Sequence, residues 1–222
     1  MNHQVKELCV NCLASGVDLL RSPNEYTRIG GAYNLFFLAS ERKEEYSEAV
    51  CNILCTHIHT ITNKQEYIIK YAEEPSKEIQ TILNILFKEE KDELIFDKCK
   101  KKLSRVILDG ADFRKAILNN VNFMNTSLKN VNFNDATLSN VDFMGARLRN
   151  VDLWDAKLTN INFKNAILRN IHFNSAILCN TVFRDATLSD VDFSHVKFEG
   201  KVIFAGTSLE NIPLLNLTVS KT

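Results

Sequence analysis

Residues 111–150 read ADFRKAILNNVNFMNTSLKNVNFNDATLSNVDFMGARLRN, and a large apolar residue stands at every fifth position of this stretch. The same frame runs from Leu108 to Phe198 without a gap. A period of five fits neither an α-helix, which repeats about every 3.6 residues, nor a strand, which alternates every two. We therefore expect a short extended step followed by a corner. Four such steps close a square coil, and stacked coils bury the apolar residues in one continuous core.

The apolar positions are of two kinds that alternate along the chain. A phenylalanine mostly follows a valine or isoleucine two residues earlier, as in Val121 and Phe123, whereas a leucine mostly follows an alanine, as in Ala116 and Leu118. Because a four-step coil stacks residues 20 positions apart, this alternation predicts columns of like side chains that fill a square interior. The phenylalanine columns are Phe113, Phe133, Leu153, Phe173 and Phe193 on one side, and Phe123, Phe143, Phe163 and Phe183 on the other.

Asparagine supplies the corners that glycine and proline would otherwise make. The chain has only seven Gly and three Pro, but an asparagine returns every ten residues from Asn120 to Asn180. Asparagine tolerates a left-handed backbone and bonds its own main chain at turns. One extra residue near Gly200 then moves the apolar pattern to Phe204, Leu209, Leu214 and Val219, which predicts a bulged final coil or two.

The runs ADFRKAILNN, VNFNDATLSN and VDFMGARLRN resemble pentapeptide-repeat proteins, whose repeats read A-(D/N)-L-x-x. The resemblance covers about 19 consecutive repeats. It implies a right-handed quadrilateral β-helix over residues 106–222.

Residues 1–105 have the spacing of helices. We expect helices over Val5 to Leu20, around 25–40, from Lys43 to about Thr62, from a first turn at Pro75 through Phe87, and a short fifth over 88–102. TRIGGAYNLFFLA and EPSKEIQTILNILF are similar to a helical region that precedes the repeats in many bacterial pentapeptide-repeat proteins. The chain is thus expected to be of the α+β class, with an α-helical cap domain over 1–105 that covers the open end of the β-helix.

Charge and composition exclude several partners. The 27 basic and 27 acidic side chains among 222 residues give a net charge of zero, so the chain is neither a bulk nucleic-acid binder nor a uniform acidic decoy. We find no stretch of signal-peptide or membrane-span character. Six cysteines are too few for a disulfide scaffold, which favours a reduced cytoplasm.

Metal, cofactor and enzyme chemistry find little support. Cys9, Cys12, Cys51 and Cys55 with His57 and His59 could form a zinc site, but they stand among apolar helix positions, which favours a core role. We expect no metal and no cofactor. His172 and His195 share a repeat face that lacks Cys179, and no phosphate-binding glycine loop occurs, so we expect no enzyme activity. In Arg28-Ile29-Gly30-Gly31 the glycines are expected to allow close helix packing.

Two sets of outward residues on the predicted β-helix are candidate binding surfaces. One face is acidic and holds the only tryptophan, an amphipathic side chain common in binding hot spots. Its candidate partner-binding residues are Trp154, Asp152, Asp155, Asp135, Asn134, Asn174 and His172. Two adjoining faces carry the candidate basic residues Lys129, Arg147, Arg149, Lys164, Arg169 and Arg184. The alternative for both sets is a solvated surface without a partner.

Three functions follow as hypotheses. The first is a non-enzymatic scaffold that binds a protein partner through β-helix faces, the helical cap, or both. The second comes from the resemblance: some relatives mimic DNA and protect DNA gyrase or topoisomerase IV, but residues 106–200 hold ten acidic and ten basic side chains, unlike a mimic. The third, and less favoured, is direct nucleic-acid contact through the basic residues. The apolar segment Ile212–Leu217 either caps the solenoid or pairs with a second copy, and of the two we favour a homodimer through the C-terminal coil.

Overall fold

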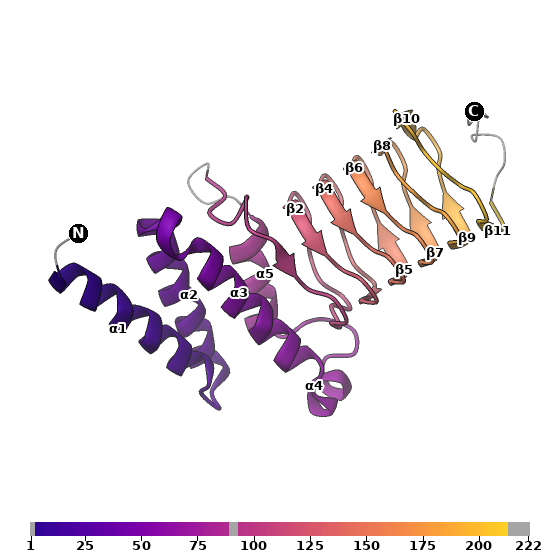
Figure 1. The fold of residues 1–222 in the computed structure, drawn as a ribbon. Coiled ribbons are helices and arrows are strands. Elements are labelled where there is room, and N and C mark those ends of the chain that lie inside the picture. Colours follow the sequence, from indigo (N-terminus) through magenta and orange to yellow (C-terminus); the bar gives the residue numbers. More distant parts are fainter. Residues whose placement is uncertain (1–2, 89–92, 213–222) are drawn as a thin grey trace.

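The computed structural model describes residues 3–88 and 93–212. Helices occupy one end of an elongated molecule, and a parallel β-solenoid forms the other (Figure 1). Within the described ranges, no helix is long and apolar enough to cross a membrane.

The described ranges contain five helices. They are α1 (His3–Leu20), α2 (Glu25–Glu41), α3 (Lys43–Thr62), α4 (Gln65–Lys70) and α5 (Lys77–Phe87). Two begin at side-chain caps, where Asn24 accepts a hydrogen bond from the Thr27 amide and Ser76 accepts one from the Ile79 amide. The expected first-turn role of Pro75 is wrong, because Ser76 is the N-cap and Pro75 precedes it.

The expected short helix over 88–102 is also wrong in its described part. Residues 95–98 form a turn, and Lys101 and Lys102 form a strand that pairs with Val121 and Asn122 of the first long strand. The helix α4 was not predicted from the sequence. Helix α4 and the strand Lys101–Lys102 are both short, and the strand forms because it pairs with a neighbouring strand rather than because its own residues show a strand pattern.

The helices stack as layers, with α1 on α2 and α2 on α3 and α5. Close approach of α1 and α2 requires a glycine at position 31, because an added Cβ would lie 2.8 Å from Leu19 Cβ and 2.9 Å from Gly16 O. The packing interpretation is confirmed for Gly31. It is wrong for Gly30, where an added Cβ would have no atom within 4 Å.

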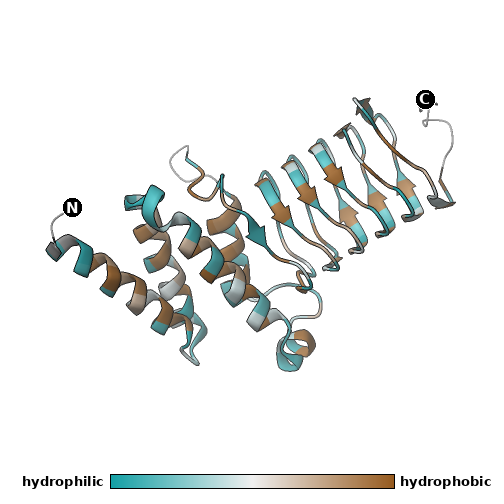
Figure 2. Cartoon of the chain, viewed as in Figure 1, coloured by the Kyte–Doolittle hydropathy of each residue, from teal (hydrophilic) through white to brown (hydrophobic). Residues whose placement is uncertain are grey.

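Eleven strands of the described chain form two parallel sheets. The strands are β1 (Lys101–Lys102), β2 (Ile117–Asn122), β3 (Ser127–Lys129), β4 (Thr137–Asp142), β5 (Arg147–Asp152), β6 (Lys157–Asn162), β7 (Ile167–His172), β8 (Ile177–Cys179), β9 (Thr187–Asp192), β10 (Lys197–Glu199) and β11 (Ser208–Glu210). One sheet has the order β1-β2-β4-β6-β8-β10 and the other β11-β9-β7-β5-β3. Leu118 pairs with Leu138 and Leu138 with Leu158, which confirms the 20-residue coil. Apolar and polar residues alternate along the strands (Figure 2).

Every corner is made by a residue with a left-handed backbone. At one kind of corner a turn closes, as where the Ala116 amide donates to Phe113 O (3.0 Å) and Lys115 has φ of 58°. A positive φ at the third residue is the type II arrangement. At the other kind the strand itself bends, as at Asn120, whose φ is 56°. Left-handed residues therefore recur every five positions, and the asparagines found from sequence mark the second kind.

Stacked rings fill the solenoid interior as predicted. Phe143 and Phe163 lie 5.0 Å apart with an interplanar angle of 8°, and Phe173 and Phe193 lie 5.2 Å apart at 2°. The slip near Gly200 is confirmed, since Leu209 pairs with Leu188 at a spacing of 21 residues. Leu214 and Val219 lie outside the described residues.

The helical region covers the first coil. Gln80 lies against the exposed backbone edge, where its side-chain amide donates to Asp112 O (2.9 Å) and accepts from Asp112 N (3.0 Å). Phe87 packs edge-on against Phe113, with ring centroids 5.7 Å apart. These contacts satisfy a strand edge and extend the ring core into the helices.

Candidate functional site

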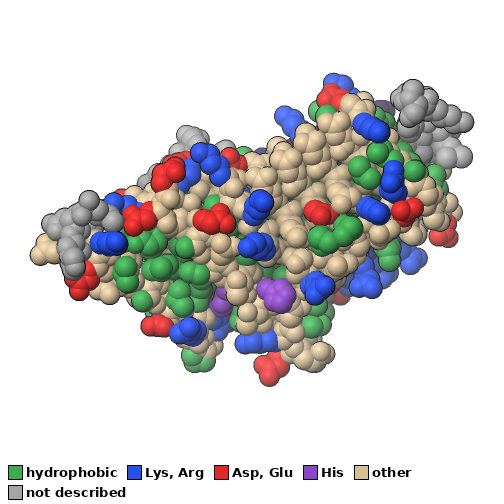
Figure 3. Space-filling view, viewed as in Figure 1, with side chains coloured by type: hydrophobic (Ala, Val, Ile, Leu, Met, Phe, Trp, Pro, Cys, Tyr) green, Lys and Arg blue, Asp and Glu red, His purple; other side chains and the backbone are tan. Residues whose placement is uncertain are grey.

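Two surfaces of the β-helix hold the candidate residues. The Trp154 face is formed by the second and third residues of the turns that begin at Phe133, Leu153 and Phe173, together with the outward residues at 152, 172 and 192. The arginine face is formed by the outward side chains of β3, β5 and the first half of β7. Charged side chains of both signs are spread over the view in Figure 3, consistent with the zero net charge.

Trp154 is 52% exposed and stands on a rigid turn. The turn closes where the Ala156 amide donates to Leu153 O (3.2 Å), and Asp155 takes the left-handed position with φ of 55°. The Trp154 amide donates to Asn134 Oδ1 in the preceding coil (2.9 Å). The indole is thus carried on a backbone held from two sides.

Asp152 and His172 explain why Asn134 serves this turn. In other coils, the equivalent amide donates to the carboxylate or carboxamide two residues earlier, as the Ser194 amide donates to Asp192 Oδ1 (2.8 Å). Here Asp152 Oδ1 instead pairs with His172 Nδ1 at 2.8 Å. The sequence-predicted residues therefore form two neighbouring pairs across three coils, Asn134 with Trp154 and Asp152 with His172.

Asn174 and the two remaining aspartates complete the face. Asn174 Nδ2 donates to Asp192 Oδ2 at 2.6 Å, while Asn174 Oδ1 is buried and has no partner among the residues described. Burial raises the pKa of Asp192, but hydrogen bonds from the Ser194 amide and Asn174 outweigh it and leave that pKa below its usual range. Asp135 and Asp155 are exposed at left-handed corners. All seven predicted residues lie on this face.

The six candidate basic residues divide into two groups. Four of them, Lys129, Arg147, Arg149 and Arg169, belong to β3, β5 and β7 of one face. Lys164 and Arg184 lie in the turns that begin at Phe163 and Phe183. Lys129 is neutralised, because its Nζ lies 2.7 Å from Glu73 Oε1 in the helical region. The sequence did not point to Glu73, which has no motif around it.

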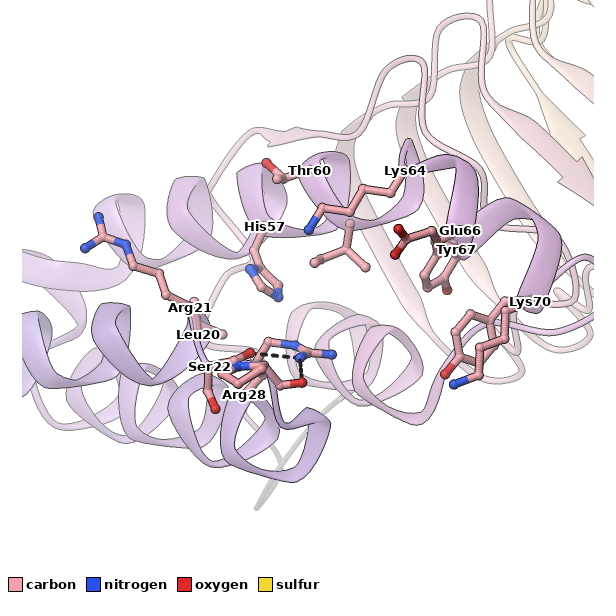
Figure 4. A pocket seen from close by; sticks show the side chains of 13 residues that line it. Leu20, Arg21, Ser22, Arg28, His57, Thr60, Lys64, Glu66, Tyr67 and Lys70 are labelled. Atoms are coloured by element: carbon pink, nitrogen blue, oxygen red, sulfur yellow. Dashed lines mark hydrogen bonds between the residues drawn. The ribbon is translucent and has the colours of Figure 1, made fainter.

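A cleft with a volume of about 580 Å³ lies in the helical region. Figure 4 shows Leu20, Arg21, Ser22 and Arg28 on one side, with His57, Thr60 and Lys64 opposite them. Beneath it, Arg28 forms a two-point pair with the buried Glu78, with Nε–Oε1 of 2.8 Å and Nη2–Oε2 of 2.7 Å. His57 Nε2 lies 2.5 Å from the same carboxylate.

Three helices are joined by this carboxylate, since Arg28 lies on α2, His57 on α3 and Glu78 on α5. Burial raises the pKa of Glu78, but hydrogen bonds from His57 and Arg28 outweigh it, so the net effect is a lowered pKa. Sequence reasoning missed this cluster, because no spacing relates residues so far apart in the chain.

The cysteines and histidines do not converge. Cys51 and Cys55 are buried in the helical core, Cys12 is exposed, and His57 bonds Glu78. Over residues 3–88 and 93–212, no group of three or more His, Cys, Asp or Glu side chains is placed to hold a metal. Burial raises the pKa of Cys99 to about 11, which disfavours its nucleophilic form.

Known proteins match the repeat part of the chain. Residues 95–173 match the family model described as a pentapeptide repeat region, and residues 166–200 match the model of pentapeptide repeats in eight copies. No curated protein matches the sequence.

Several solved structures are similar. Rfr23, a pentapeptide repeat protein of the cyanobacterium Cyanothece 51142, has 22% identity, with 56% of this chain and 78% of that one covered and a TM-score of 0.26. A pentapeptide repeat protein from the Arabidopsis thaliana thylakoid lumen has 22% identity, with 41% and 67% covered and a TM-score of 0.27. Full-length QnrB1, a plasmid-mediated fluoroquinolone resistance protein, has 16% identity, with 51% and 80% covered and a TM-score of 0.19.

Proposed function

Because residues 95–200 of this chain belong to the pentapeptide-repeat family, we propose that the protein is a non-enzymatic scaffold that binds a protein partner through the Trp154 face. The helical region covers the first coil, and Trp154, Asp135 and Asp155 remain exposed on the β-helix. In this proposal the protein acts in the cytoplasm, which the six free cysteines support.

The observation that carries the proposal is an exposed indole on a fixed backbone. A tryptophan that is 52% exposed leaves apolar surface in water, which binding would remove. The turn and the Asn134 bond hold its backbone before any partner arrives, so little backbone conformational freedom is lost on association. Asp135, Asp155 and the Asp152–His172 pair surround it with polar groups, the arrangement of an apolar anchor inside a polar rim.

A pull-down with matched baits tests this proposal. The baits are the wild-type chain, Trp154→Ala, and Met144→Ala, which changes the equivalent turn position on another corner. We expect one protein to be retained by wild type and Met144→Ala and lost with Trp154→Ala. With that protein purified, Trp154→Ala should weaken binding by about 30-fold, the effect of a hot spot of about 2 kcal/mol. Equal retention by all three baits would contradict the proposed face.

Protection of DNA gyrase or topoisomerase IV is the second candidate. The observation in its favour is that Asp135, Asp152, Asp155 and Asp192 gather on the Trp154 face. Against it stands the arginine face of the same rod. A supercoiling assay with added protein separates the two: no inhibition and no rescue from a quinolone at micromolar protein would dismiss this candidate and leave the scaffold proposal standing.

A homodimer through the C-terminal coil stays a proposal. Of the segment from Ile212 to Leu217, only Ile212 is among the described residues, where it packs against the core. Equilibrium sedimentation should give twice the monomer mass if the proposal holds.

A further inference from the structure

Three arginines stand together on the arginine face. Arg149 of β5 is the register partner of Arg169 of β7, and Arg147 precedes Arg149 by two positions on the same side of β5. Parallel strands lie about 4.8 Å apart, and residues two apart in a strand about 6.6 Å, so the three side chains start within about 8 Å of one another. All three are exposed.

No acidic group neutralises this cluster in the part of the chain that the structure describes. Three carboxylates near the cluster are engaged elsewhere: Glu73 pairs with Lys129, Asp109 accepts bonds from Ser127 Oγ and the Lys129 amide, and Asp190 bonds Asn211. The guanidinium groups of Arg147, Arg149 and Arg169 make no hydrogen bond or ion pair with any described residue. The side chains of Lys164 and Arg184, in the turns before β7 and β9, also have no partner among the described residues and extend the positive patch.

The groups around the arginines suit phosphate better than a protein surface. Protein interfaces have a core with aromatic anchors, but the outward side chains of this face include no aromatic residue and one exposed apolar one, Ile167. The remainder includes hydroxyl and carboxamide groups, at Ser127, Asn150 and Asn170, which with arginine are the usual contacts to nucleic-acid backbones. Arginine also bonds phosphate with two parallel N–H groups.

The flat shape of the face selects among nucleic acids. Single strands are held by stacking on aromatic side chains, and this face has none. Duplex RNA is recognised largely through its 2′-hydroxyls, whereas the arginines of this face suit contacts to phosphate. We propose that the arginine face is a second binding surface, separate from the Trp154 face, that contacts the phosphate backbone of duplex DNA without reading its sequence.

Fluorescence anisotropy with a labelled random-sequence DNA duplex tests the proposal on the full chain. If the three arginines each neutralise one phosphate, affinity should fall by about 40-fold between about 50 and 200 mM salt. The double variant Arg149→Glu with Arg169→Glu should lose at least about tenfold in affinity at the lower salt. The matched control is Lys102→Glu with Lys157→Glu, which makes the same charge change at two exposed lysines on other faces and should stay within about twofold of wild type.

The remaining outcomes also decide the question. No binding at about 50 mM salt, an affinity that does not change with salt, or an equal loss in the control variant would overturn the proposal. Displacement of the labelled DNA duplex by single-stranded RNA or duplex RNA at lower concentrations than by unlabelled duplex DNA would overturn the choice of duplex DNA as the ligand. Should the double glutamate variant fail to fold by circular dichroism, Arg149→Gln with Arg169→Gln must show a weaker loss in the same direction. Trp154→Ala should bind DNA as wild type, so the two proposals fail independently.

Discussion

Each corner of the β-helix requires one residue that adopts a left-handed backbone conformation. Asparagine meets it at Asn120, Asn140 and Asn160, where the carboxamides also bond one another from coil to coil, as in Asn160 Nδ2 to Asn140 Oδ1 at 3.0 Å. Arg105, Lys115 and Ser175 adopt the same conformation although their residue types rarely do. There the hydrogen bonds of neighbouring coils impose the corner.

Substitution of Gly145 tests this requirement. Its φ is 67°, and an added Cβ would lie 2.3 Å from Asn125 Oδ1. Gly145→Ala should therefore lower the free energy of unfolding by about 1–3 kcal/mol, because alanine is strained there and the Asn125 side chain must move. Asn165→Gly, at the same turn position one coil later, should change it by less than about 0.5 kcal/mol. Urea unfolding compares the two, and an equal effect of both changes would contradict the argument.

Elements of this protein were predictable where a long pattern specifies them. The columns of Phe143, Phe163 and Phe183 follow from spacing alone, and so does the slip near Gly200. The six-residue helix α4 and the two-residue strand β1 were not predictable, since one is too short for a helical period and the other depends on β2. The residues of the Trp154 face were found as a set, but the Asp152–His172 pair that reroutes the Trp154 amide appears only in the structure.

Truncation of a central ring tests the column. Phe163 is fully buried. Its ring centroid lies 5.0 Å from that of Phe143, 5.1 Å from that of Phe183 and 6.4 Å from that of Phe173, which packs edge-on. Phe163→Ala should lower the free energy of unfolding by about 3–5 kcal/mol, because neighbouring coils cannot collapse into the cavity. Phe163→Leu should cost clearly less, since Leu153 already interrupts the other column. Thermal unfolding by circular dichroism measures both, and equal costs would argue against ring stacking as the organising contact.

The Glu78 carboxylate joins three helices through its contacts with Arg28 and His57, and the stability of these contacts depends on pH. Its pKa is lowered from a usual value of 4.5, so its stabilising pairs are complete at neutral pH and are lost as the pH falls below that value. Glu78→Gln should therefore lower the free energy of unfolding at pH 7 by about 3 kcal/mol, and the difference from wild type should shrink in acid. Urea unfolding across the acidic range measures this.

The control for Glu78 is an exposed pair. Glu93 contacts Lys43 at 2.7 Å but its side chain is 57% exposed. Glu93→Gln should shift stability by less than about 1 kcal/mol at every pH. A difference between Glu78→Gln and wild type that stays constant from neutral to acid pH would mean that the carboxylate charge is not the cause.

At the scale of the whole molecule, stability should be graded along the rod. The first coil is covered by α5 through Gln80 and Phe87, whereas the coil of β11 leaves Leu209 44% exposed and only partly buries Phe198 and Phe204. In a solenoid, each coil is stabilised mainly by its neighbours. Backbone amides of 196–212 should exchange with solvent deuterium at least about tenfold faster than those of 138–178. Mass spectrometry of the exchanged protein would show this, and uniform protection would mean that the rod unfolds as one unit.

Because the register is a constant 20 residues, the residue number of a side chain determines both its position along the rod and its direction around the rod axis. Loss of residues 121–140 would remove one whole coil and bring Trp154 closer to the helical end by about 4.8 Å. Its direction around the rod axis would be unchanged. Loss of only residues 121–130 would keep the order of phenylalanine and leucine but turn everything beyond it by half a revolution. Insertions and deletions in this chain can therefore change the distance of a surface residue along the rod separately from its direction around the axis. A globular core does not allow these two changes to be made independently.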